Sequence, residues 1–375
     1  MASPAASGAR SRLRPPEVLS WRMAGGRDRA GGSLRTVPGF DHHDPGLRDV
    51  AARAGVSLST VSRVVTGRTQ VSDRLKQRVL AAVAELGYRP NAAAQALVSG
   101  RRSSIAVMAR NTTRFGYAGT LQGIEEAASA AGYAVMIAVV ESDDPARISA
   151  AVDQVLSHSV AGVIVIEFDD VGRATLEAVP DSLPVVAAAG APSVERTRPH
   201  VYLDDDLGGR IATEYLLSLG HRTVHHVSIP STRPDSGRSR GWRRALEAVG
   251  AEVPDEVPAL YSPESGYGAA QSLLDDPSVT AILCGNDELA IGVARALAER
   301  GRKVPEEVSV VGFDDQPFAR MWLPALTTVA QDFTELGRHA FALLEQWLRT
   351  GAVPADAVIE PRLVLRESSV PPSLG

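Results

Sequence analysis

Three runs of apolar residues with helical spacing lie between residues 46 and 91. They cover 47–54, 58–65 and 73–86, and glycine, a common helix-ending residue, directly follows the first and the third. Ser57 and Ser72 precede the second and third runs, where serine commonly caps a helix. Two short helices joined by a glycine-containing turn are typical of a helix-turn-helix motif. We expect these apolar positions to face a small shared core: Leu47, Val50, Ala51, Ala54, Val56, Val61, Val64, Leu75, Val79, Ala82, Val83 and Leu86.

Basic residues are concentrated in the same part of the chain. Residues 47–102 hold ten Lys and Arg against three Asp and Glu, a formal charge of +7, whereas the whole chain of 375 residues carries −5. Residues 1–46 carry +3, which leaves −15 for residues 103–375. A basic module on an acidic body is the electrostatic pattern of a nucleic-acid-binding protein. An ordinary helical bundle with a solvated polar face is the alternative, but the turn, the caps and the charge coincide here.

The second helix of such a motif enters the major groove of DNA. We expect Leu58, Ser59 and Arg63 to project outward, with Arg63 able to pair with guanine O6 and N7. Hydroxyl side chains suit phosphate oxygens, which position a protein on DNA without reading its sequence. The candidates of this kind are Thr60, Ser62 and Thr69.

From Ser104 the pattern changes to apolar strands that alternate with amphipathic helices. Such alternation predicts an α/β core of two doubly wound lobes, each a parallel sheet covered by helices on both faces. A ligand would then bind at the carboxyl ends of the strands, in the cleft between the lobes. The expected strands are 105–109, 134–140, 161–168, 184–189, 223–230, 281–287 and 308–315, and the expected helices are 117–131, 145–157, 208–219, 238–249, 287–300 and 333–349.

Composition narrows the class of protein. Hydrophobic residues make up 44% of the chain and charged residues 22%, as in soluble globular proteins. The chain has no apolar run long enough to span a membrane, so we expect a cytoplasmic protein without a membrane partner. Cys284 is the sole cysteine, and we interpret His225 and His226 as strand residues rather than metal ligands. The sequence contains no nucleophile–base pair, phosphate-binding loop or dinucleotide fingerprint, so we expect neither enzymatic activity nor a cofactor.

The segment DVAARAGVSLSTVSRVV, followed by VSDRLKQRVLAAVAELGYRPN, resembles the DNA-binding headpiece of the LacI/GalR (lactose-repressor) family, and a looser match continues to Ser368. The resemblance implies a homodimeric transcription regulator, most simply a repressor, that binds a near-palindromic double-stranded DNA operator. It also implies that a small-molecule effector sets the DNA affinity from a periplasmic-binding-protein-like core.

The resemblance divides the chain into a helix-turn-helix domain at 46–90, a hinge at 91–102 and an effector-binding and dimerisation domain at 103–375. Residues 1–45 lack periodicity, and we interpret them as a disordered extension or as sequence upstream of a later start such as Met23. The hinge begins at Asn91, and Leu97 takes the place of the family's leucine wedge in the minor groove. The alternative role for Leu97 is a linker residue that packs on the core.

The resemblance also assigns the lobes and the effector pocket. It implies crossings between the lobes near Asp204, Thr328 and Ala352, with helix 333–349 returning to the first lobe and 361–368 to the second. Because the chain shows no terminal leucine-heptad helix, we expect a dimer rather than a tetramer. The effector-contact candidates are Arg238, Tyr261, Asn286, Asp314 and Phe333, whereas Asp287 is expected to be a helix cap.

The expected effector is a small carbohydrate, because arginine and carboxylate groups can bind vicinal hydroxyls while aromatic rings cover the apolar face of a sugar. A nucleobase or a phosphorylated metabolite acting as co-repressor is the alternative within the same class. From another class, a solute-binding receptor of a transporter would share the two lobes but not the headpiece.

Overall fold

The computed structural model describes residues 45–66, 71–88, 103–190, 198–230 and 237–372, which fall into two compact units. One unit is Met1–Arg89 and the other is Pro90–Gly375. Three DNA-contact candidates, Thr69, Asn91 and Leu97, lie outside the described residues.

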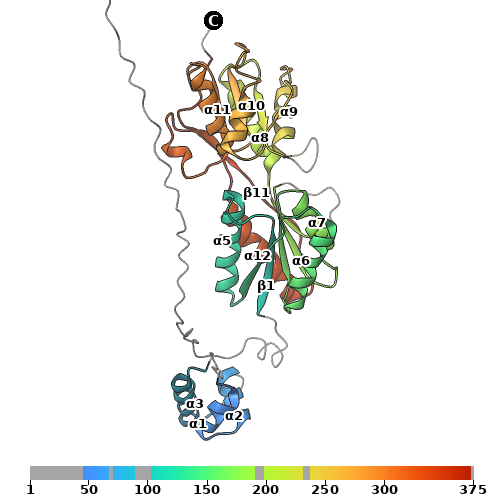
Figure 1. Ribbon diagram of the computed structural model, residues 1–375, viewed down its shortest axis with the longest axis vertical. Coiled ribbons are helices and arrows are strands. Elements are labelled where there is room, and N and C mark those ends of the chain that lie inside the picture. The colour runs from blue at the N-terminus through green and yellow to red at the C-terminus, as the bar shows by residue number, and fades with distance from the viewer. Residues whose placement is uncertain (1–44, 67–70, 89–102, 191–197, 231–236, 373–375) are drawn as a thin grey trace, which may run out of the picture. The chain divides into compact units, whose positions relative to one another are not determined.

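The smaller unit contains the three helices that the apolar spacing predicted: α1 (Leu47–Ala54), α2 (Leu58–Thr66) and α3 (Asp73–Leu86) (Figure 1, blue). Their apolar faces meet in one small core, in which Val50, Val61 and Val79 are fully buried. The turn between α1 and α2 depends on Gly55, whose φ of +62° allows the backbone N–H groups of Gly55 and Val56 to close the end of α1. The three predicted helices are therefore confirmed.

The larger unit contains two six-stranded sheets, one in each lobe (Figure 1). The first sheet is entirely parallel, in the order β11-β5-β4-β3-β1-β2. Helices α5 (Phe115–Ala130) and α12 (Phe333–Thr350) cover one face, and α6 (Pro145–Ser157) and α7 (Asp170–Ala178) cover the other. Its strands are β1 (Ser104–Ala109), β2 (Ala134–Val139), β3 (Val163–Glu167), β4 (Val185–Ala189), β5 (His200–Leu203) and β11 (Ala357–Ile359).

The second sheet has the order β12-β10-β9-β8-β6-β7, and only the edge strand β12 runs antiparallel to its neighbour. Helices α8 (Asp205–Ser218) and α9 (Gly237–Ala248) cover one face, and α10 (Pro263–Ala270) and α11 (Asp287–Glu299) cover the other. Its strands are β6 (His225–Ser228), β7 (Val257–Pro258), β8 (Ala281–Cys284), β9 (Ser309–Asp314), β10 (Thr327–Ala330) and β12 (Arg362–Val364). The predicted two-lobed α/β architecture is confirmed.

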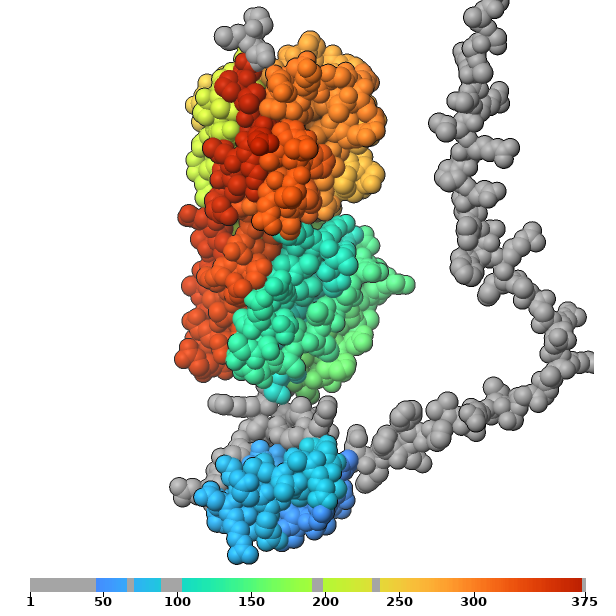
Figure 2. All heavy atoms as spheres, turned by 90° about the vertical axis from the view of Figure 1, so that its left-hand side faces the viewer, coloured from blue at the N-terminus to red at the C-terminus, as the bar shows by residue number. Residues whose placement is uncertain are grey.

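The chain crosses between the lobes three times. The first crossing, at Asp204, and the return of α12 to the first lobe after Gln331 and Asp332 agree with the sequence prediction. The third crossing was predicted near Ala352, which is wrong. After α12 ends, the chain first adds β11 to the edge of the first sheet, and it crosses only at 360–361 to form β12 in the second sheet. Figure 2 shows these last segments, in red, along both lobes.

Glycines bring paired helices close together in both lobes. A Cβ atom on Gly123 of α5 would lie 1.9 Å from the Thr334 carbonyl oxygen of α12. A Cβ on Gly209 of α8 would lie 2.1 Å from the Arg238 carbonyl of α9, and one on Gly292 of α11 would lie 1.9 Å from the Pro263 carbonyl of α10. Because real Cβ atoms do not approach backbone so closely, each pair packs only through glycine.

The substitution Gly292→Ala should therefore destabilise the second lobe by about 1–3 kcal/mol, because the new methyl group forces α10 and α11 apart. Urea unfolding followed by tryptophan fluorescence measures the change. Gly268→Ala on α10 is the matched control, because a Cβ at Gly268 meets no atom within 4 Å. It should stabilise the protein by up to about 1 kcal/mol through helix propensity. Equal effects of the two substitutions would contradict the close packing at Gly292.

Candidate functional site

The headpiece presents α2 to solvent as the sequence pattern predicts. The side chain of Leu58 is 46% exposed, Ser59 and Arg63 are exposed, and Val61 between them is buried. Ser57 caps this helix, because its hydroxyl accepts the Thr60 backbone N–H at 3.2 Å. The same hydroxyl lies 2.9 Å from Ser59 Oγ and 2.8 Å from Thr60 Oγ1, which orders the polar start of α2. Ser62 is partly buried.

Arg78 braces the turn, a role that sequence analysis missed. Its Nη2 donates to the Ala54 carbonyl at 2.6 Å and to the Gly55 carbonyl at 3.3 Å, so α3 satisfies the carboxyl end of α1. A charged donor at a helix C-terminus is favourable because the free carbonyls carry partial negative charge. Arg78 is therefore a brace within the headpiece, whereas Arg63 is free to point outward.

In the larger unit, a cavity of about 160 Å³ lies where the two lobes face each other at the carboxyl ends of their strands. All five effector-contact candidates line it: Arg238, Tyr261, Asn286, Asp314 and Phe333. Sequence analysis missed other lining residues, among them Arg114, Tyr117, Glu167, Phe168, Asp205, His226, Glu288 and Gln331.

Arg238 is the centre of the polar wall. Its Nη2 donates to Asp314 Oδ1 at 3.1 Å and to Gln331 Oε1 at 3.0 Å, and its Nη1 donates to the Gly285 carbonyl. Its Nε lies 3.3 Å from Asp205 Oδ2, an ion pair rather than a well-aligned hydrogen bond. The guanidinium plane also lies over the Phe313 ring, 3.9 Å from its centroid. A ligand therefore meets an arginine whose donors already bind protein groups.

Burial shifts the pKa values of the ionisable groups around Arg238. Burial raises the pKa of Asp314 to about 6, although Arg238 opposes the rise. Burial also raises the pKa of Asp205 above its ordinary value. Burial lowers the pKa of Arg238, but the charges of Asp205 and Asp314 outweigh that effect and raise it overall. Asp314, at the end of β9, holds a φ of +98°, a strained conformation for a non-glycine residue.

Aromatic rings cluster on the first-lobe elements that line the cavity. Phe333, at the start of α12, meets Phe115 and Phe168 edge to face, with ring centroids 5.8 and 5.9 Å apart. Phe168 in turn meets Tyr117 at 5.0 Å. Tyr261 belongs to the other lobe, and the Arg114 guanidinium lies 4.3 Å from its ring centroid, a cation–π contact between the lobes. The cavity thus combines a cluster of aromatic rings with charged side chains from both lobes.

The expected cap at Asp287 is wrong, because the cap of α11 is its neighbour. Asn286 Oδ1 accepts the Leu289 N–H at 2.7 Å, and its Nδ2 donates to the Tyr261 carbonyl at 3.1 Å. Asp287 turns into the core, where it accepts from Thr328 Oγ1 at 2.5 Å and from the Gln316 N–H at 2.7 Å. Burial raises the pKa of Asp287 to about 8. Asn286 therefore occupies the N-cap position of α11, and Asp287 is buried in the core.

The buried His200 forms an ion pair with Glu167, one of the residues that line the cavity. His200 on β5 directs Nε2 at Glu167 Oε2, 3.1 Å away, and Nδ1 at the Arg198 carbonyl, 2.7 Å away. Both partners are acceptors, so both ring nitrogens donate when the imidazole is protonated. Burial lowers the pKa of His200, but the contacts with Glu167 and Arg198 raise it overall.

Within the described residues, no helix is long and apolar enough to cross a membrane, and no group of three or more His, Cys, Asp or Glu side chains is placed to hold a metal ion.

A helix-turn-helix unit joined to a two-lobed α/β core with a cavity between its lobes defines the class of ligand-responsive DNA-binding regulators. Comparison with known proteins specifies the family. The model of bacterial regulatory proteins of the lacI family matches residues 46–91, and that of periplasmic binding protein-like domains matches 213–369. The HTH-type transcriptional regulator DegA of Bacillus subtilis (strain 168) is 34% identical over 87% of this chain and 98% of its own length.

Solved structures agree. A lac repressor dimer bound to operator and the anti-inducer ONPF matches with a TM-score of 0.79 and 30% identity, over 87% of this chain and 99% of that chain. A complex of the transcriptional regulator CelR with cellobiose matches with a TM-score of 0.65 and 31% identity, over 86% and 99% of the two chains. The chain belongs to the LacI family and is a DNA-binding transcriptional regulator. The similar proteins named here are regulators and not enzymes.

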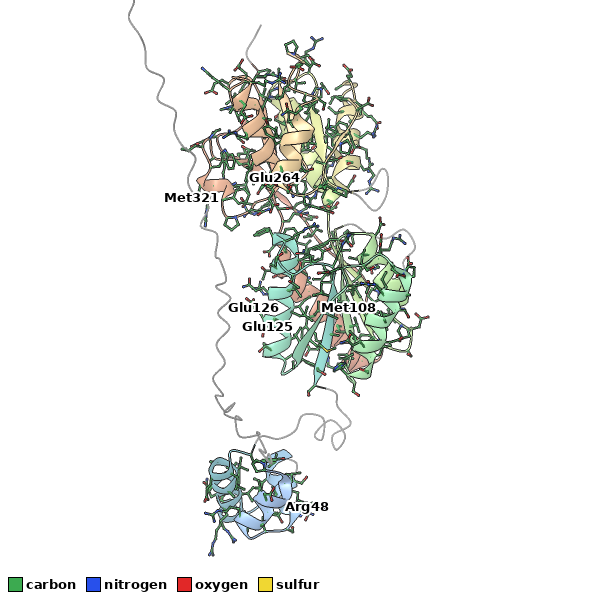
Figure 3. All side chains as sticks on the ribbon, in the orientation of Figure 1. Arg48, Met108, Glu125, Glu126, Glu264 and Met321 are labelled. Carbon is green, nitrogen blue, oxygen red and sulfur yellow. The ribbon has the colours of Figure 1, made fainter. Side chains whose placement is uncertain are left out.

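Replacement of Arg63 by alanine should relax the preference for one base pair by roughly 1–3 kcal/mol, because the outward guanidinium is the group of α2 suited to guanine. Binding to a library of DNA sequences measures the preference. Arg48→Ala is the matched control, since it removes the same exposed charge from α1 (Figure 3). It should change affinity for all sequences alike. An unchanged preference in the Arg63 variant would exclude a base-reading role.

Glu167→Gln should lower the pKa of His200, because the variant removes the carboxylate that stabilises the imidazolium. In the wild type, the protonated pair contributes stability fully below the unfolded histidine pKa of about 6.5 and loses it as pH rises through the higher folded value. The difference in unfolding free energy between wild type and variant should therefore shrink with rising pH. NMR titration of His200 checks the cause, and a wild-type pKa at or below the ordinary value would contradict it.

Proposed function

We propose that this chain is a repressor that binds a near-palindromic operator as a homodimer and releases it when a neutral sugar enters the cavity. The contacts to DNA would come from the outward face of α2, with Arg63 reading bases and the hydroxyls of Thr60, Ser62 and Thr69 binding phosphates. Asn91 and Leu97 would act in the hinge, with Leu97 entering the minor groove at the centre of the operator. The protein would act in the cytoplasm, where the operator is.

The observation that carries the effector assignment is that aromatic rings and several carboxylates line the same cavity. Among the described residues, four acidic side chains line the cavity, namely Glu167, Asp205, Glu288 and Asp314, against the two arginines Arg114 and Arg238. Because Arg238 already pairs with two of the carboxylates, a phosphate group would meet uncompensated negative charge. Hydroxyl groups, in contrast, can donate to carboxylates and accept from a guanidinium.

The aromatic rings suit the apolar face of a sugar ring. Phe333, Phe115 and Phe168 present apolar surface to the cavity, on which the C–H face of a pyranose or furanose can pack. The cellobiose complex of a similar regulator supports the same class of ligand. We therefore favour a carbohydrate over a nucleobase or a phosphorylated metabolite.

The same cavity supports a mechanism for release. Arg238 binds Asp205, just after the first crossing, and Gln331, just before the second. Sugar hydroxyls that bind Arg238 and Asp314 would compete with these contacts and shift the crossing segments. The change in DNA affinity would equal the difference in sugar affinity between the two arrangements of the lobes.

Exposed apolar side chains support a dimer. In the second lobe, Met321 is 78% exposed (Figure 3), and Leu323, two residues further along the chain, is 88% exposed. On the edge strand β2 of the first lobe, Ile137 and Val139 are 50% and 47% exposed. Exposed large apolar side chains are candidates for association surfaces, and the similar lac repressor structure is a dimer bound to operator.

Thermal unfolding in the presence of neutral mono- and disaccharides, sugar phosphates and purines tests the effector class. A sugar at about 100 times its dissociation constant should stabilise the folded protein by about 2.7 kcal/mol. Each sugar is compared with its enantiomer at the same concentration, because any sugar stabilises proteins weakly by exclusion from their surface. A shift that only a purine or a phosphorylated compound produces would contradict the proposal, as would equal shifts for both enantiomers of every sugar.

A further inference from the structure

His226 lies in the polar wall of the cavity but has no role in the network around Arg238. It belongs to β6, the strand that precedes α9 in the chain. His226 is fully buried and is among the residues that line the cavity. Buried polar groups are normally hydrogen-bonded, because an unsatisfied one loses its interaction with water without replacement. Each ring nitrogen therefore requires a partner.

The protein satisfies one of the two nitrogens. Nδ1 lies 3.0 Å from the Leu283 carbonyl on the neighbouring strand β8, and a carbonyl accepts only from a protonated nitrogen. In the neutral ring, the proton is therefore on Nδ1, and Nε2 carries a lone pair. Nε2 is buried and has no hydrogen-bond partner among the described residues.

The position of the ring is well defined. The Trp242 ring lies 5.4 Å away, centroid to centroid, and Trp242 is itself held by a hydrogen bond of 2.8 Å from Nε1 to the Val224 carbonyl. Burial lowers the pKa of His226, so the ring stays neutral and Nε2 remains an acceptor. The ring is thus a rigid, neutral acceptor at the cavity wall.

The neighbouring histidine provides a comparison within the same strand. His225 also has a buried nitrogen, Nδ1, without a hydrogen-bond partner among the described residues. Its side chain points to the opposite face of the sheet, because successive residues of a strand alternate, and it does not line the cavity. An unpaired nitrogen occurs in both residues, but of the two residues only His226 is among those that line the cavity.

We propose that His226 Nε2 accepts a hydrogen bond from a hydroxyl group of the effector and thereby helps to select a neutral polyhydroxylated ligand. This inference rests on the proposed function, because it names a residue that would recognise the sugar. A lone pair at this point favours a donor such as O–H over a group that offers only acceptors, such as a phosphate or carboxylate oxygen. It adds a selecting contact to those expected of Arg238, Asn286 and Asp314.

The test uses the sugar that stabilises the full-length wild-type protein most, chosen from the neutral mono- and disaccharides. Calorimetric titration measures its dissociation constant for the wild type, His226→Leu and His226→Gln. The leucine variant loses the acceptor and should bind about ten-fold more weakly. The glutamine variant can present an amide oxygen to the cavity and should recover part of the loss. His225→Leu is the matched control and should bind within about two-fold of the wild type.

Two further measurements separate a direct contact from a structural effect. In the wild type, the ¹⁵N resonance of His226 Nε2 should move when the sugar binds, while Nδ1 stays protonated. Among monodeoxy derivatives of the sugar, one should bind the wild type about ten-fold more weakly yet bind His226→Leu as well as the parent sugar does. That derivative identifies the hydroxyl that donates.

Equal affinity of the sugar for the wild type and His226→Leu, or an unmoved Nε2 resonance, would overturn the role of His226 and leave the proposed function in place. Stabilisation by no sugar at all would overturn both. If the leucine variant does not fold, the glutamine variant and the wild-type resonance decide, since an unmoved resonance alone contradicts the contact.

Discussion

The contacts of the buried Arg238 guanidinium are the interaction on which the cavity of the larger unit depends. It holds Asp205, Asp314, Gln331 and the Gly285 carbonyl at once, and these groups come from the start of α8 and the ends of β8, β9 and β10. Two carboxylates and a guanidinium can be buried together because each offsets the desolvation of the others, and removal of one partner would leave an unpaired buried charge. Glycine supports the arrangement, since α8 and α9 approach through Gly209 directly under the Arg238 backbone.

The same network connects the cavity to all three crossings between the lobes. Asp205 follows the first crossing, and Gln331, which precedes the second, donates to Asp205 Oδ1 at 2.5 Å. The Asp204 N–H donates to the Ile359 carbonyl at 3.1 Å, which ties the first crossing to the third. A ligand that binds Arg238 therefore acts where the chain passes from lobe to lobe. A differential affinity for two lobe arrangements is the physical requirement for control of DNA binding at a distance.

The sequence predicts the elements that local residue patterns determine, and it does not predict those that depend on contacts between residues distant in the chain. The headpiece helices and the strands β1, β3, β8 and β9 follow from local apolar spacing and end residues, and they were predicted. The strands β5, β7, β10, β11 and β12 were not, because they lie outside the longer apolar runs and their pairing is decided by partners distant in the sequence. In the cavity, motif positions identified Arg238, Asn286 and Asp314. The roles of Gln331 and His226 in the cavity were not predicted. The contact between Arg238 and Gln331 spans 93 residues, and the surroundings of His226 depend on the register between strands. The error at Asp287 has a similar cause, because either residue of the Asn-Asp pair can cap a helix and only the fold buries one of them.

The central claim is that one molecule couples a sugar in the cavity to DNA on the headpiece. The most direct test measures the affinity of the protein for a DNA fragment that it selects from a random pool, with and without a saturating amount of the stabilising sugar. The account predicts that the sugar weakens DNA binding by about 5–150-fold, and that the DNA weakens sugar binding by the same factor. A sugar that binds tightly while the DNA affinity stays unchanged would contradict it.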